Sequence, residues 1–136
     1  MDARLRATVA ERAGNCCEYC RLPARFSRLS HQIDHIIPQQ HGGLTEPANL
    51  AFACFHCNGH KGPNLTGIDP DTGVIKLFNP RTERWSEHFR WQGARIVGIS
   101  AVGRATVAVL AMNDEIEVDR RAVWLATGLW RPTEES

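Results

Sequence analysis

Two pairs of cysteines have the spacing of metal ligands. Cys17 and Cys20 form one Cys-x-x-Cys pair, Cys54 and Cys57 form a second, and 33 residues separate the pairs. A two-residue spacer lets both thiolates of a pair reach one tetrahedral zinc ion at about 2.3 Å. Four sulfur ligands leave no open coordination position, so we predict a structural Zn²⁺ held by all four. The alternative is a set of four buried or redox-active thiols.

Two neighbouring side chains bear on this zinc site. Cys16 would need a three-residue spacer to Cys20, so we expect a free, buried thiol there. His56 lies inside the second cysteine pair and is the alternative ligand, in place of one sulfur.

The start of the sequence favours a reducing compartment. Residues 1–13 carry charges throughout and do not resemble a signal peptide. No stretch approaches the roughly 18 apolar residues of a membrane helix. We therefore expect a cytoplasmic protein, in which thiols bind metals rather than form disulfides. Because the net charge of 136 residues is only +1, attraction to phosphate must be local.

A second group of polar residues has the chemistry for phosphodiester hydrolysis. That reaction needs a nucleophilic water, a neutralised phosphate and a stabilised 3′ oxygen. An imidazole changes its protonation near neutral pH, which suits His35 to take the proton from water as a general base. Asp34 and Asn58 offer hard oxygen ligands for one divalent cation, most simply Mg²⁺.

The order of these residues resembles the HNH endonuclease signature. The resemblance covers residues 12–64 and is carried by Asp34-His-Ile-Ile-Pro38, Gly42-Gly43, Asn49-Leu50 and Cys54-Phe-His-Cys-Asn58-Gly-His-Lys61. It implies a ββα-metal core in which His35, Asn49 and Asn58 occupy the three named catalytic positions. It also implies that Asn49 holds the loop backbone so that His35 faces the scissile phosphate. Residues 67–73 and 85–91 are similar to one bacterial subfamily of short HNH proteins.

Two features of this site need explanation. Asn58 stands where many family members carry His, and its neutral amide oxygen should favour Mg²⁺ or Mn²⁺ over Ni²⁺ or Zn²⁺. Adjacent side chains of a regular strand point to opposite faces, so Asp34 and His35 share a site only if the strand ends or bulges there. A solvent-facing Asp34 is the alternative.

Basic residues around the site are candidates for nucleic-acid contacts. Lys61 lies one helical turn beyond Asn58 and could contact phosphate, with an exposed helix face as the alternative. His60 and His41 are weaker candidates, and His31 is expected to be a structural histidine rather than an active-site partner. A solvated connector explains three further candidates equally well: Arg21, Arg25 and Arg28.

Sequence periodicity predicts the elements that position these residues. A helix should follow Asp2 and stop at Gly14. The predicted order of the site itself is a strand over Ser30–Ile37, a loop over Gln39–Ala48, a strand over Leu50–Ala53 and a helix from Cys54 to Gly62.

The second half of the chain is predicted from turns and apolar runs. Turn residues over 66–73 precede candidate strands at Val74–Phe78 and Ser86–Trp91. Glu87–Trp91 and Arg95–Ser100 should form a hairpin, followed by helices over Gly103–Met112 and Val118–Ala126. We expect five aromatic side chains to form core rather than a base-stacking surface: Trp85, Phe89, Trp91, Trp124 and Trp130.

The sequence therefore predicts an α+β protein that forms one domain, residues 1–136. Its ββα-metal core would cover about 12–64, with a hairpin-and-helix extension, about 65–136, packed on it. The predicted function is a DNA endonuclease in which His35 is the general base and Asp34 and Asn58 hold Mg²⁺ or Mn²⁺. The alternatives are the same chemistry on RNA, or a non-catalytic zinc module that binds nucleic acid.

Overall fold

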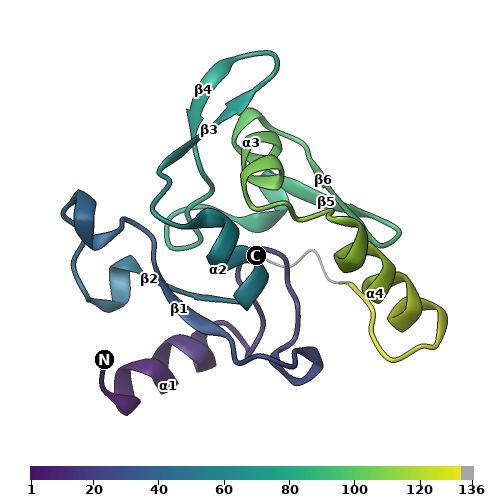
Figure 1. The fold of residues 1–136 in the computed structure, drawn as a ribbon, viewed down its shortest axis with the longest axis horizontal. Helices are drawn as coiled ribbons and strands as arrows, with labels where there is room; N and C mark the ends of the chain where they lie inside the picture. The colour runs from purple at the N-terminus through teal and green to yellow at the C-terminus, as the bar shows by residue number, and fades with distance from the viewer. Residues whose placement is uncertain (133–136) are drawn as a thin grey trace. The chain divides into compact units, whose positions relative to one another are not determined.

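The computed structural model describes residues 1–132 of the chain (Figure 1). Contacts within the chain define two compact units. The N-terminal unit is Met1–Leu65 with Asn79–Thr82, and the C-terminal unit is Thr66–Phe78 with the chain from Glu83 onward. Both units combine helices and strands, which confirms the α+β class. One domain over residues 1–136 stays a prediction. No helix within residues 1–132 is long and apolar enough to cross a membrane.

Helix α1 (Ala3–Arg12) opens the N-terminal unit as predicted. The Asp2 side chain caps it by accepting a hydrogen bond from the backbone N–H of Leu5 at 2.8 Å. Gly14 ends it with a φ of +63°, a conformation that glycine adopts without strain. Val9 packs with Leu50 and Phe52 into the apolar core of this unit.

Strands β1 (Gln32–His35) and β2 (Leu50–Ala53) form an antiparallel hairpin, with Asp34 opposite Ala51. β2 has its predicted bounds, whereas β1 is shorter than the predicted Ser30–Ile37. Pairing stops after His35: the Ile36 amide still donates to the Asn49 carbonyl, but the Ile36 carbonyl accepts from Lys61 and the Asn49 amide donates to Glu46.

The connection between the strands is a loop with two 3-10 turns, Gln39–His41 and Pro47–Asn49. It requires glycine at position 43, where a Cβ would lie 1.6 Å from the carbonyl oxygen of Ile37. Helix α2 (Phe55–Lys61) follows β2, with Cys54 as its N-cap and Gly62 as its C-cap. The order strand, loop, strand, helix is confirmed.

The C-terminal unit contains two hairpins and two helices. β3 (Thr66–Asp69) pairs with β4 (Gly73–Lys76), and β5 (Phe89–Gln92) pairs with β6 (Arg95–Gly98). Helices α3 (Ala101–Val109) and α4 (Glu115–Ala126) follow. The second hairpin and both helices were predicted.

Several predicted boundaries in this unit were wrong. Strand β3 was not predicted, because residues 66–73 are rich in turn formers. Gly67 is needed in this strand, since a Cβ there would lie 2.7 Å from the Val109 side chain of α3. A 3-10 turn at Trp85–Glu87 replaces the start of the predicted strand. Helix α3 stops before Ala111, which has a φ of +48°. Helix α4 starts at Glu115 because Asp114 caps it.

Aromatic packing supports the predicted core of the C-terminal unit. The ring centroids of Trp85 and Phe89 lie 5.1 Å apart, and those of Trp91 and Trp130 lie 5.2 Å apart. Trp124 meets Trp130 edge-on. Trp85, Phe89 and Trp130 are buried, whereas Trp91 and Trp124 are half-buried.

Candidate active site

The four paired cysteines converge in the N-terminal unit. All four sulfurs lie within 4.8 Å of one another, and all four side chains are buried. A tetrahedral zinc ion with bonds of about 2.3 Å would separate its sulfurs by about 3.8 Å. The amides of Cys20 and Cys57 donate to the sulfurs of Cys17 and Cys54 at 3.4 and 3.3 Å. The donor set therefore fits a structural zinc ion.

Burial raises the pKa of the Cys17 thiol, but hydrogen bonds from the other three cysteines prevail and hold it well below its usual range. Hydrogen bonds, led by those to Cys17, raise the pKa of Cys20 and Cys57 well above the usual range. Zinc binds the thiolate, so binding of the ion would release the protons that the cluster shares. Cys16 lies outside the sulfur cluster, as predicted, and its side chain is half-buried rather than buried. His56 is not part of the cluster either.

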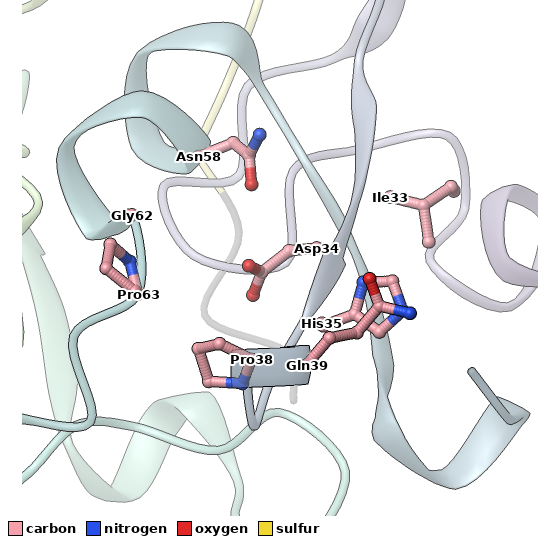
Figure 2. Close-up of a pocket in the computed structure, with 8 residues that line it drawn as sticks. All are labelled: Ile33, Asp34, His35, Pro38, Gln39, Asn58, Gly62 and Pro63. Atoms are coloured by element: carbon pink, nitrogen blue, oxygen red, sulfur yellow. The ribbon is translucent and has the colours of Figure 1, made fainter. Parts of the chain in front are cut away.

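A cavity of about 270 Å³ lies in the same unit, beside β1 and α2 (Figure 2). It is lined by Ile33, Asp34, His35, Pro38, Gln39, Asn58, Gly62 and Pro63. Asp34, His35 and Asn58 are thus brought to one cavity. Within residues 1–132, β1 pairs only with β2, so its other edge has no strand neighbour there. At an open edge near the strand end, neighbouring side chains from both faces can line the same cavity.

The Asp34 carboxylate is buried and already has two protein partners. The Tyr19 hydroxyl donates to Oδ2 at 2.7 Å, and the Lys61 ammonium lies 3.2 Å from each oxygen. Burial raises the pKa of Asp34, and the Lys61 and Tyr19 contacts oppose that shift. The alternative of a solvent-facing Asp34 is therefore wrong. Because Oδ1 has one partner, it retains a lone pair for a cation.

Lys61 is buried, with 1% of its surface exposed. Besides Asp34, its ammonium donates to the carbonyls of His35 and Ile36, each at 3.2 Å. An ammonium has three donors, and these acceptors occupy them. Neither the predicted phosphate contact nor the exposed-face alternative agrees with this placement, because the helical turn points Lys61 inward at the end of β1.

Asn58 is half-buried on α2, and its side-chain nitrogen donates to Oε1 of Gln32. Figure 2 shows that the remaining amide oxygen of Asn58 points toward Asp34. Gln32 was missed by the sequence analysis. Its signal was available, because residues two apart on a strand share a face and Gln32 precedes Asp34 by two.

The His35 ring contacts the loop that follows β1. Its Nε2 lies 2.8 Å from Oγ1 of Thr45, and the Gln39 side chain donates to the same hydroxyl oxygen at 3.3 Å. Thr45 was also missed, as was Tyr19. Neither residue carries a spacing signal: Thr45 reaches the site through the folded loop, and Tyr19 through the segment between Cys17 and Cys20.

Asn49 is buried and holds the two ends of the loop together. Its Oδ1 accepts from the Ile37 amide at 2.8 Å, and its Nδ2 donates to the carbonyls of Ile37 and Leu44 at 3.0 and 2.9 Å. These three hydrogen bonds are the contacts that Asn49 would need in order to hold the loop backbone, the role predicted for it.

The remaining candidates lie outside this cavity. Arg28, His41 and His60 are exposed. The His60 ring stacks on His56, with centroids 4.2 Å apart. His31 is buried, with its Nε2 2.9 Å from the Leu22 carbonyl oxygen, which agrees with a structural histidine.

The sequence model of one protein family, described as HNH endonuclease, matches residues 17–64. This segment holds the four paired cysteines as well as Asp34, His35, Asn49 and Asn58. The resemblance to the HNH endonuclease family is thereby confirmed over residues 17–64. No curated protein and no solved structure matches the chain.

Proposed function

We propose that this protein is a metal-dependent endonuclease that hydrolyses phosphodiester bonds of DNA in the cytoplasm. One observation carries the proposal: Asp34, His35 and Asn58 line one cavity within the segment that matches the HNH family. A general base activates the attacking water, and oxygen ligands hold the cation that assists hydrolysis of a phosphodiester.

Asp34 and Asn58 would hold the divalent cation. The free lone pair of Asp34 Oδ1 and the amide oxygen of Asn58 are both hard ligands, which favours Mg²⁺ or Mn²⁺. When bound, such a cation neutralises the phosphate and stabilises the departing 3′ oxygen. Tyr19 and Lys61 keep the Asp34 carboxylate in one orientation, and Gln32 does the same for the Asn58 amide.

His35 would act as the general base through Nδ1. The Thr45 hydroxyl has two acceptor lone pairs: Gln39 donates to one, and in this mechanism Nε2–H of His35 donates to the other. That contact keeps the proton on Nε2 and leaves Nδ1 to take one from water. The water oxygen then bonds to phosphorus, the bond from phosphorus to the 3′ oxygen breaks, and that oxygen takes a proton from solvent.

Asn49 and the zinc ion would support this geometry without touching substrate. The three hydrogen bonds of Asn49 fix the loop that carries Thr45. The cysteine cluster ties Cys17 and Cys20 to the start of α2, the helix that carries Asn58. Rigid support of this kind keeps catalytic groups within the narrow tolerance that the reaction needs.

The test is a cleavage assay of the purified protein on duplex DNA in Mg²⁺, Mn²⁺ or Ni²⁺. His35→Ala should lower the rate by about 100-fold or more, because a positioned general base contributes that much. Zinc content and circular dichroism should not change. Gln40→Ala is the matched control, since Gln40 is an exposed residue of the same loop that does not line the cavity.

Two results would redirect the proposal. Cleavage of RNA in preference to DNA would keep the chemistry and change the substrate. Equal inactivity of the wild-type protein and His35→Ala on both nucleic acids, in every metal, would favour the non-catalytic zinc module.

A further inference from the structure

A second cavity in the N-terminal unit is lined by basic, polar and apolar side chains. Its volume is about 430 Å³, and it is lined by Arg6, Ala7, Ala10, Ala24, Ser27, Arg28, Ser30, His31, Ile33 and Phe52. This volume falls within the range of about 300–1,000 Å³ that is typical of ligand sites. The lining includes two arginines, two serines and a histidine but no carboxylate.

The chemistry of the lining divides into two parts. Arg6 and Arg28 supply positive charge and hydrogen-bond donors, the groups that bind phosphate. Ala10, Ile33 and Phe52 belong to the apolar packing between α1 and the β1–β2 hairpin, and an apolar wall suits a sugar or the face of a base. A strand of nucleic acid presents both chemistries together.

The cavity lies beside the proposed active site. Ile33 lines both cavities. His31 directly precedes β1, and Ile33 and His35 belong to it. These three residues are spaced two apart, so in an extended segment their side chains lie on the same face. An extended segment from His31 to His35 spans about 13 Å. That length corresponds to about four base-pair steps measured along the axis of B-form DNA, at about 3.4 Å per step.

One buried atom of the cavity wall lacks a partner. Nδ1 of His31 has no hydrogen-bond partner within residues 1–132, although the side chain is 96% buried, its exposure being 4%. A buried nitrogen of this kind is stabilised when a ligand or a water supplies the missing hydrogen bond.

We propose that this cavity binds the part of the substrate strand that flanks the scissile phosphate, with Arg6 and Arg28 contacting its backbone phosphates. This inference rests on the proposed function, because it assigns the strand's position relative to His35. It also explains how a protein of net charge +1 can attract nucleic acid, since the positive charge is placed at one cavity.

The chain supplies a matched control for each arginine. Arg4 is exposed on the same helix as Arg6, and Arg25 is exposed in the same connector as Arg28. Neither lines the cavity. The Arg25 guanidinium instead lies 4.6 Å from the centre of the Phe26 ring. Each pair of alanine variants therefore removes the same charge from the same element.

The experiment measures binding of a fluorescein-labelled DNA oligonucleotide by anisotropy, without divalent metal, between about 50 and 200 mM salt. Arg6→Ala and Arg28→Ala should each weaken binding about 10-fold at the lower salt and reduce the salt slope by about one. Arg4→Ala and Arg25→Ala should stay within about twofold of wild type, because exposed charges away from the contact contribute little. Equal losses in all four variants, or no loss in Arg6→Ala and Arg28→Ala, would overturn the assignment.

Hydrolysis of bis(p-nitrophenyl) phosphate separates this inference from the proposed function. This diester has no flanking nucleotides, so we expect all four arginine variants to hydrolyse it at the wild-type rate. If the wild-type protein fails to hydrolyse it and to cleave DNA, the catalytic proposal fails, while the binding comparison still decides the role of the cavity.

Discussion

The two units of the chain differ in where their buried polar groups lie. In the N-terminal unit, the buried polar side chains of Asp34 and Asn49 surround or support a cavity. In the C-terminal unit, buried Asp69, Thr106 and Arg121 have hydrogen-bond partners in their own unit. Buried polar groups are costly unless they are paired. A unit that keeps buried polar groups beside a cavity therefore needs stabilisation from other interactions. The sulfur cluster of the same unit can supply that stabilisation.

Removal of zinc should have the largest effect and should act on one unit. Structural zinc contributes about 10 kcal/mol or more in zinc-finger peptides, as much as the whole stability of many domains. A strong chelator should therefore abolish amide-exchange protection of β1, β2 and α2. All four tryptophans belong to the C-terminal unit, so tryptophan emission should keep its native wavelength.

Cysteine variants give the matched control for this result. Cys54→Ser should behave like the chelated protein, whereas Cys16→Ser should keep about one zinc per chain and full protection, because Cys16 lies outside the cluster. Retained protection of β1 after complete loss of zinc would contradict the idea that the metal stabilises this unit.

Loss of the buried Lys61 ammonium should have the second-largest effect on stability. The same substitution at an exposed lysine of the C-terminal unit should have a much smaller effect. Lys61→Met leaves the Asp34 carboxylate buried without its ion pair, and we expect a loss of about 3 kcal/mol in the free energy of unfolding. Lys76→Met breaks the pair with Glu83 in the C-terminal unit, where the lysine is 58% exposed. That variant should lose less than about 1 kcal/mol. Urea unfolding measures both.

A second substitution tests the reason for the Lys61 effect. If the cost comes from the unpaired charge, Asp34→Asn should restore part of the stability of Lys61→Met. Similar losses for Lys61→Met and Lys76→Met would mean that the buried pair is no more important than the exposed one.

Gln32→Leu should lower the affinity for the proposed catalytic metal without unfolding either unit. Gln32 accepts from the Asn58 amide nitrogen, and the loss of this contact frees the amide to rotate. Partners that orient a metal ligand typically contribute about 10-fold or more to affinity. Titration with Mn²⁺ measures the change, and Gln92→Leu, at an exposed position of β5, is the control. Unchanged Mn²⁺ affinity in Gln32→Leu would exclude a positioning role.

The sequence was most informative where spacing alone decides the chemistry. The two Cys-x-x-Cys pairs predicted the sulfur cluster because a tetrahedral metal accepts few spacings. The strand at Leu50–Ala53 and the helix stop at Gly62 were readable from local patterns. In the C-terminal unit, β3 was missed because Gly67 looks like a turn residue, although its actual role is close packing against α3.

The hydrogen-bond partners of the site residues could not be predicted from the sequence. Tyr19 contacts Asp34 only after the segment between Cys17 and Cys20 has folded, and Thr45 contacts His35 only after the loop has folded. The inward direction of Lys61 depends on how α2 packs on β1, and helical spacing does not encode it. Local patterns therefore gave the candidate ligands and the candidate base, and tertiary contacts decide what holds these side chains in place.

The smallest effect should come from Asp69→Asn in the C-terminal unit, and it should depend on pH. Asp69 is fully buried and receives hydrogen bonds from Arg104 at 2.5 and 3.2 Å and from Thr72 at 3.0 Å. These contacts, led by that of Arg104, hold the pKa of Asp69 well below its usual range. Asparagine keeps the shape and part of the bonding, and Arg104 is 38% exposed, so we expect the melting temperature to fall by only a few degrees at pH 7.

The lowered pKa gives the sign of the pH dependence. The ionised carboxylate stabilises the folded state at every pH above about 4, the usual value in an unfolded chain. Its contribution is lost as the pH falls from there toward the lower folded pKa, so the gap between wild type and Asp69→Asn should narrow below pH 4. Asp71→Asn is the control, since Asp71 is 80% exposed and 3.9 Å from Arg104. A gap that stays constant from pH 7 to pH 2 would show that Asp69 contributes through its shape rather than its charge.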